Sequence, residues 1–143
     1  MLTLNQIKKI LKDYFNAHAL INSVYYMDDF NFNAERSIDY PVANIEYVNS
    51  DINIGVMNHN YKIVIADLCE LDNAEMEDNI HSDSLQIAED FFTYLQNYEG
   101  LIFKKTSSIN HFTEDTGDLA AGIVFTVQLG TIRKQNWCDS PTK

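Results

Sequence analysis

The residues best suited to chemistry in this chain are carboxylates, which gather in one central segment. The six acids of this segment, which contains no lysine or arginine, are Asp67, Glu70, Asp72, Glu75, Glu77 and Asp78. Carboxylate oxygens are the ligands that calcium prefers, but a calcium-binding loop needs them at fixed offsets around a glycine. The segment lacks both the spacing and the glycine. It is therefore interpreted as an acidic surface and not as a cation site.

Histidine and cysteine, the usual acid–base and nucleophilic residues, are sparse. His81 and Asp83 are close enough in sequence to form a pair, but the other three histidines are distant and complete no H-E-x-x-H pattern. Cys69 follows an apolar stretch among acids, a setting that does not favour a reactive thiolate. Neither Cys69 nor Cys138 belongs to a C-x-x-C pair, and the sequence has no glycine-rich nucleotide loop. These observations predict no catalytic residue, metal site or cofactor.

The overall composition narrows the class of protein. The chain has 143 residues, of which 45% are hydrophobic, so it is long and apolar enough to form one domain with its own core. With 21 acidic and 10 basic residues its formal net charge is −11, which argues against a basic groove for nucleic acid. It has no apolar run of membrane-spanning length and no signal-peptide pattern. We expect a single domain over residues 1–143, with a polar tail over residues 131–143, two reduced thiols and no membrane partner.

The first predicted helix begins near the N-terminus. Thr3 and Gln6 have the spacing of a capping box, and apolar residues then recur at helical intervals as far as residues 16–18. The three lysines of this helix, at residues 8, 9 and 12, lie off the apolar stripe. We interpret them as a solvated face.

The second predicted helix begins near residues 82–83 and ends at Gly100. Two adjacent apolar stripes run along it, and they comprise Leu85, Ala88, Phe92 and Leu95, and Ile87, Phe91, Tyr94 and Tyr98. Two stripes predict a helix that is covered on more than one side, for example by its own sheet and by a neighbouring subunit.

Alternation of apolar and polar residues predicts the strands. They are expected over residues 23–30, 41–56, 61–68, 101–105 and 121–129, with a hairpin turn at residues 58–60 and a polar loop over residues 106–118. The strands follow one another without a β-α-β rhythm. The sequence therefore predicts an α+β fold, with a mostly antiparallel sheet of about five strands and the two main helices packed on one face.

Four stretches of the sequence carry a family resemblance. They comprise residues 40–48, 81–90, 112–122 and 136–141. Together they resemble small neck or tail-completion proteins of tailed bacteriophages, of the kind found in phages of Bacteroidota, including crAss-like phages. The predicted order of elements is also similar to that of phage tail terminators, which are small α/β proteins that assemble as rings.

The resemblance implies a structural role in the virion neck or tail, after assembly in the host cytoplasm. It implies a ring of about six or twelve copies that contacts portal, adaptor or tail-tube proteins and lets DNA pass through its channel. The six acids of the central segment are then candidate channel-lining residues, because they would repel DNA phosphates. The candidate subunit contacts are Phe91, Tyr94, Tyr98, Phe112 and Trp137.

Two other functions suit the same sequence. An acidic adaptor, or a nucleic-acid mimic that inhibits a basic partner, would also use a net charge of −11. A small enzyme with a site built from scattered acids and histidines is the third possibility, although no catalytic spacing supports it. The ring protein and the mimic differ in self-assembly, because a mimic needs only one exposed acidic face and no contact between copies.

Overall fold

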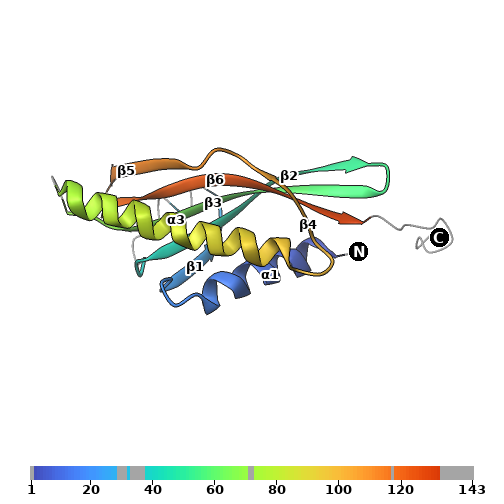
Figure 1. Ribbon diagram of the computed structural model, residues 1–143, viewed down its shortest axis with the longest axis horizontal. Helices are drawn as coiled ribbons and strands as arrows, with labels where there is room; N and C mark the ends of the chain where they lie inside the picture. Colours follow the sequence, from blue (N-terminus) through green and yellow to red (C-terminus); the bar gives the residue numbers. More distant parts are fainter. Residues whose placement is uncertain (1, 29–31, 33–37, 71–72, 117, 133–143) are drawn as a thin grey trace.

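The computed structural model describes residues 2–28, 32, 38–70, 73–116 and 118–132. The elements in chain order are α1 (Leu4–Ala17), β1 (Ser23–Tyr26), β2 (Val42–Asn53), β3 (Val56–Leu68), α3 (Ala74–Gln96), β4 (Ile102–Thr106), β5 (Asn110–Thr116) and β6 (Asp118–Ile132). The sheet order is β1-β2-β3-β6-β4, and β5 also pairs with β6. Strand β1 is parallel to β2, and the other pairs are antiparallel. This arrangement confirms the predicted α+β class (Figure 1).

The long strand β6 holds the sheet together. One of its sides pairs along almost its whole length with β3, from Val56↔Ile132 to Leu68↔Ala120. The other side pairs with β4 near its C-terminal end and with β5 near its N-terminal end. The two short strands thus share one edge of the sheet, which explains why six strands make a sheet about as wide as the five that the sequence predicts.

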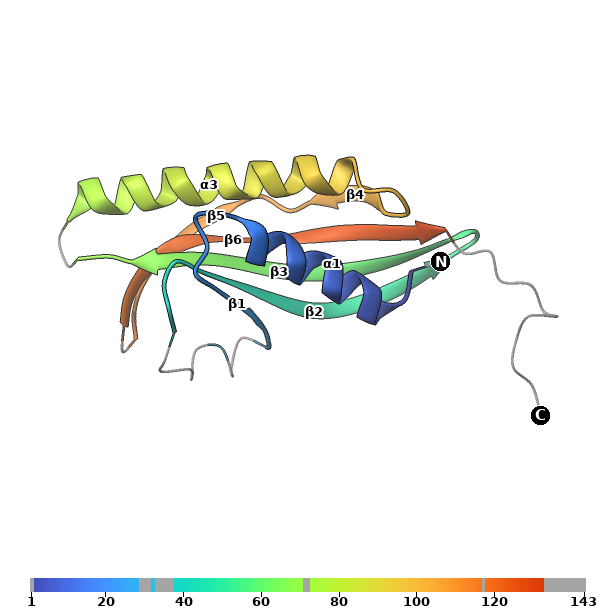
Figure 2. The ribbon, with the colours of Figure 1, turned by 90° about the horizontal axis from the view of Figure 1, so that it is seen from below.

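Both helices pack on the same face of the sheet, as the sequence predicts (Figure 2). α1 lies against β1 and β2, and α3 lies against β6, β4 and β3. Their buried side chains form one core with odd-numbered residues of β2, β3 and β6. At its centre the rings of Phe15 and Phe91 lie 4.8 Å apart, and Phe91 also lies 6.4 Å from Phe125. Burial of these large aromatic rings is a major source of stability for the two layers.

A smaller apolar cluster covers part of the opposite face. Its buried members are Phe32, Val42, Val64, Ala66 and Ala120, and half-buried aromatic residues such as Tyr25 and Phe112 pack against them. The even-numbered residues of β3 point to this face because side chains alternate along a strand. The sheet is therefore apolar on both faces at the end where β2 begins and β3 ends.

The first helix matches its prediction closely. The side chain of Thr3 accepts a hydrogen bond from the backbone N–H of Gln6, and the side chain of Gln6 accepts one from the N–H of Thr3. This capping box satisfies two N–H groups that have no partner within the helix. The helix ends at Ala17, inside the predicted range of residues 16–18.

The second helix begins about two turns earlier than the sequence suggests, so the predicted start at residues 82–83 is wrong. Asn73 is the N-cap, and its side chain accepts a hydrogen bond from the N–H of Met76. Glu75 and Glu77 occupy the first turn, where negative charge interacts favourably with the helix dipole. The acidic segment is therefore partly helical. Its charge suits a helix N-terminus as well as it suits a loop.

Several strand boundaries also need correction. The β2–β3 turn lies at residues 54–55, where Gly55 adopts φ +79°, and not at residues 58–60. Residues 58–60 belong to β3, because pairing with strands on both sides satisfies their backbone and outweighs the turn preference of asparagine. The predicted loop over residues 106–118 contains β5, β1 ends at Tyr26, and residues 131–132 extend β6. Residues 133–143 of the predicted tail lie outside the described residues.

Replacing Phe91 with alanine is expected to destabilise the protein by about 3–5 kcal/mol, because it leaves a cavity between both helices and the sheet. Urea denaturation measures this loss. Leu85→Ala on the same helix is the matched control: Leu85 is 44% exposed, so its truncation is expected to change stability by less than about 0.5 kcal/mol. Equal losses in the two variants would contradict the assigned core.

Gly122→Ala is expected to disrupt the pairing of β3 with β6. A Cβ atom at this position would lie 1.9 Å from the carbonyl oxygen of Ile65, a distance that requires the backbone to move. Gly130→Ala, on the same strand, is the control, because its closest contact is the flexible end of Lys104 at 3.0 Å. Thermal unfolding should show that Gly122→Ala lowers the free energy of unfolding by more than about 2 kcal/mol and that Gly130→Ala lowers it by less.

Candidate functional site: charged faces of the two helices

The structure brings most of the predicted channel-lining acids together at one end of the molecule. There β3 leads into α3, and Figure 2 shows this connection at the end of the sheet far from the N-terminus. We name the described acids of this region the end acids; they are Asp67, Glu70, Glu75, Glu77 and Asp78. Asp72 lies outside the described residues. The end acids therefore come from a strand, a connection and a helix, and they form one acidic end.

Hydrogen bonds from neutral donors hold three of the end acids. Asp67 Oδ1 accepts from the N–H of Leu68 at 2.8 Å, and Glu70 Oε2 accepts from Asn73 Nδ2 at 3.2 Å. Glu77 Oε1 accepts from the hydroxyl of Thr113 at 2.8 Å, which links α3 to β5. These donors orient the carboxylates without neutralising them, so the end stays negatively charged.

The structure corrects one of the predicted subunit contacts. Phe91 has no exposed surface and lies in the core of its own chain, so the prediction that it contacts a neighbouring subunit is wrong. The apolar stripe that includes Phe91 could not reveal this, because a core stripe and a contact stripe have the same spacing.

The other predicted contacts that the structure describes lie in two different places. Tyr94 and Tyr98 are half-buried beside α1, where the rings of Tyr94 and Tyr14 lie 4.9 Å apart. Burial raises the pKa of Tyr94, and it raises that of Tyr14 to about 12. Phe112 packs against the small cluster on the opposite face of the sheet, and Trp137 lies outside the described residues. The structure therefore does not gather Tyr94, Tyr98 and Phe112 into one surface.

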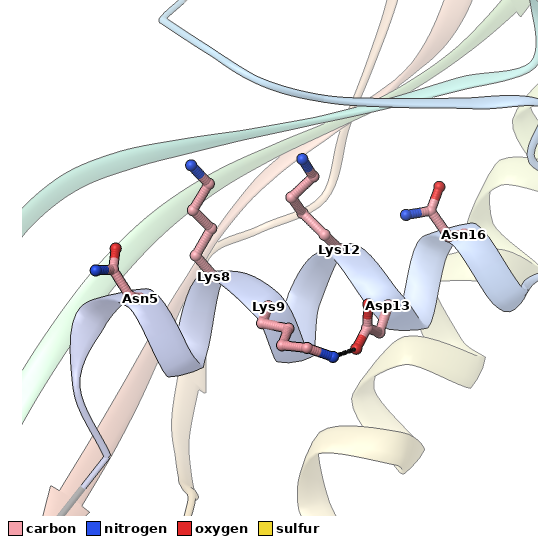
Figure 3. Close-up of a pocket in the computed structure, with 6 residues that line it drawn as sticks. All are labelled: Asn5, Lys8, Lys9, Lys12, Asp13 and Asn16. Carbon is pink, nitrogen blue, oxygen red and sulfur yellow. Dashed lines mark hydrogen bonds and ion pairs between the residues drawn. The ribbon is translucent and has the colours of Figure 1, made fainter.

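A basic surface lies on the side of α1 that faces β1. We name Lys8 and Lys12 the lysine face, since both project from the same side of the helix (Figure 3). The ammonium of Lys8 lies 4.6 Å from the centre of the Tyr26 ring, so this face is turned toward edge strand β1. Lys9 bends away and pairs with Asp13 at 2.6 Å. Within the described part of the chain Lys12 has no ion pair. The face borders a shallow depression of about 310 Å³.

The helix α3 is acidic along its length. Its six acids, accompanied by no lysine or arginine, are Glu75, Glu77, Asp78, Asp83, Glu89 and Asp90. Asp90 contacts His18 at 3.3 Å and Gln86 at 3.1 Å. Asp83 and Glu89 are exposed and form no ion pair with any described residue. We name these two residues the central acids. The helical layer thus carries positive and negative surfaces on separate helices.

Sequence reasoning missed a buried polar network at the β2–β3 pair. The hydroxyl of Tyr47 lies in hydrogen-bond contact with Ser50 Oγ, which lies 2.7 Å from His59 Nδ1. A bulge between Tyr47 and Asn49 shifts the register and places Ser50 opposite His59. A serine–histidine pair can form a nucleophile and base, but His59 is only 2% exposed. We therefore interpret the network as structural. No sequence pattern signals a bulge of this kind.

The remaining two histidines of interest stack on one another. His81 of α3 and His111 of β5 lie 4.6 Å apart with nearly parallel rings. Among the described residues, no group of three histidine, cysteine, aspartate or glutamate side chains is placed to hold a metal ion. In the same part of the chain, neither helix combines the length and the apolar character that a membrane span needs.

No known protein-family model matches this chain, and no curated protein sequence matches it.

Acidification is expected to destabilise the protein through His59. Burial lowers the pKa of His59 below its unfolded value of about 6.5, so protons bind the unfolded chain more tightly. The contribution of neutral His59 is complete above about pH 6.5 and falls below it. The urea midpoint of unfolding is measured at one pH above and one pH below about 6.5. On acidification, the midpoint should fall further for the wild type than for His59→Gln. Parallel losses in both proteins would assign the effect to other groups.

Proposed function

We propose that this chain is a structural virion protein of a tailed phage, which forms a homo-oligomeric ring in the neck or tail connector. Its role there would be that of a tail terminator or head–tail joining protein. The observation that carries the proposal is the separation of charge between α1 and α3, with the lysine face on one helix and exposed acids on the other. Complementary surfaces on different sides of one chain favour head-to-tail contact between copies, and such contacts close into a ring when the rotation from one copy to the next permits it.

The end acids support the second part of the proposal, which is the passage of DNA. A channel lined with carboxylates repels phosphates and keeps DNA from adhering while it moves. Five carboxylates at one end of the molecule suit such a lining. The resemblance of the sequence to neck and tail-completion proteins points to the same role.

Exposed apolar residues at the other end of the sheet support contacts with further virion proteins. Ile54 at the β2–β3 turn is fully exposed, and Ile52 and Ile132 nearby are at least half exposed. Apolar side chains of this size gain stability when a partner covers them. Portal, adaptor or tail-tube proteins are the partners that we propose for this end.

The native mass of the purified protein tests the proposal. We expect a discrete mass near six or twelve subunits at low salt, measured by light scattering over a range of concentrations. The mass should fall as salt screens the charged contact. A monomer at every concentration and salt level would contradict self-assembly.

An acidic adaptor or nucleic-acid mimic is the second candidate, because α3 carries six acids and no lysine or arginine. A mimic presents its acids to a basic partner and needs no self-contact. A monomer that binds a basic DNA-binding protein tightly, and loses this binding at high salt, would support the mimic over the ring.

A further inference from the structure

We infer that β2 is an interaction surface, on which a second copy of this chain pairs its own β2 to make one continuous sheet. The contact involves residues 47–53 of each copy, which run antiparallel about a two-fold axis. It does not depend on the proposed ring, because it joins two identical edges, whereas a ring joins two different surfaces.

The inference starts from an uneven edge of the sheet. β1 pairs with β2 only from Val42 to Ile45, whereas β2 continues to Asn53 (Figure 2). On the β1 side, no described strand pairs with residues 47–53. Backbone N–H and C=O groups that point to that side are open to another strand, which would gain main-chain hydrogen bonds there.

The shape of this edge fits a second copy of itself. The short β1 leaves a recess that is one strand wide and lies beside residues 47–53 of β2. When two copies pair antiparallel over these residues, β2 of each copy fills the recess of the other, and each β1 lies beyond the partner's β2–β3 turn. The opposite edge of the sheet does not fit the recess, because β4 and β5 both pair with β6 and neither projects beyond the other by a strand.

The side chains along the recess also suit this pairing. Val48 and Ile52 are 48% and 60% exposed. With Ser50 at the two-fold axis, Val48 lies opposite Ile52 of the partner subunit, so that each copy covers exposed apolar surface of the other. Asp51 then lies opposite Asn49 of the partner subunit, and two carboxylates do not face one another directly.

The first test is the mass of the protein at several concentrations and salt levels, measured by light scattering. We expect a dimer that becomes stronger as salt is added, because each copy has a net charge of −11 and salt screens the repulsion between copies. Val48→Lys/Ile52→Lys places charges in the recess and should raise the concentration for half dimerisation at least about tenfold. Leu68→Lys/Leu85→Lys is the matched control, because both leucines are exposed and lie outside the recess. Circular dichroism checks that both variants are folded.

The second test is cross-linking at the two-fold axis. Ser50→Cys is made in a chain with Cys69→Ser and Cys138→Ser, so that it carries a single thiol. Opposite residues of an antiparallel pair have Cα atoms about 4.5–5.5 Å apart, a separation that a disulfide can span. Oxidation should therefore yield a covalent dimer. Ser108→Cys in the same background is the control, because it is exposed in the connection between β4 and β5 on the opposite edge.

The outcomes separate this inference from the proposed ring. A dimer that strengthens with salt, weakens in Val48→Lys/Ile52→Lys and cross-links at residue 50 but not at residue 108 supports the pairing of β2 edges. Unchanged assembly of the lysine variant, or equal cross-linking at both positions, overturns it. Six or twelve copies that dissociate in salt and tolerate the lysines support the ring and overturn the edge pairing. A monomer under all conditions overturns both.

Discussion

The contact between the rings of Phe15 and Phe91 is the interaction on which the two-layer structure depends. Neither side chain has exposed surface, and together they join α1, α3 and the sheet in one core. Because this core fixes both helices over different strands, it also fixes the directions of their polar sides. The lysines of α1 and the acids of α3 therefore stay apart. The apolar interior thus determines the electrostatic pattern of the surface.

Features with a local cause could be predicted from the sequence. The capping box of Thr3 and Gln6 needs only residues three positions apart, and the structure contains both of its hydrogen bonds. The alternation along residues 121–129 predicted a strand because one of its faces is fully buried. The α+β class and the single helical face follow from the order of such elements, and the structure has both.

Features that depend on distant partners could not be predicted. Residues 58–60 have the composition of a turn, but strands on both sides hold them in β3. Apart from Phe112, β5 has only polar residues, and it is a strand because β6 offers it an edge. The same limit applies to the candidate site. Phe91 and Tyr94 lie on one helical stripe, and only the packed structure assigns the first to the core and the second to the flank beside α1.

The position of β6 has a consequence for how the chain reaches its fold. β6 is the last strand in the described chain, yet it lies inside the sheet and pairs residues far apart in sequence, such as Ile63 and Phe125. Contacts of this kind slow folding, since a long loop must close before they form. During translation β2 and β3 emerge first, and the free edge of β3 then offers unpaired N–H and C=O groups to other chains. Exposure to misassembly is therefore greatest in the interval before the ribosome completes β6.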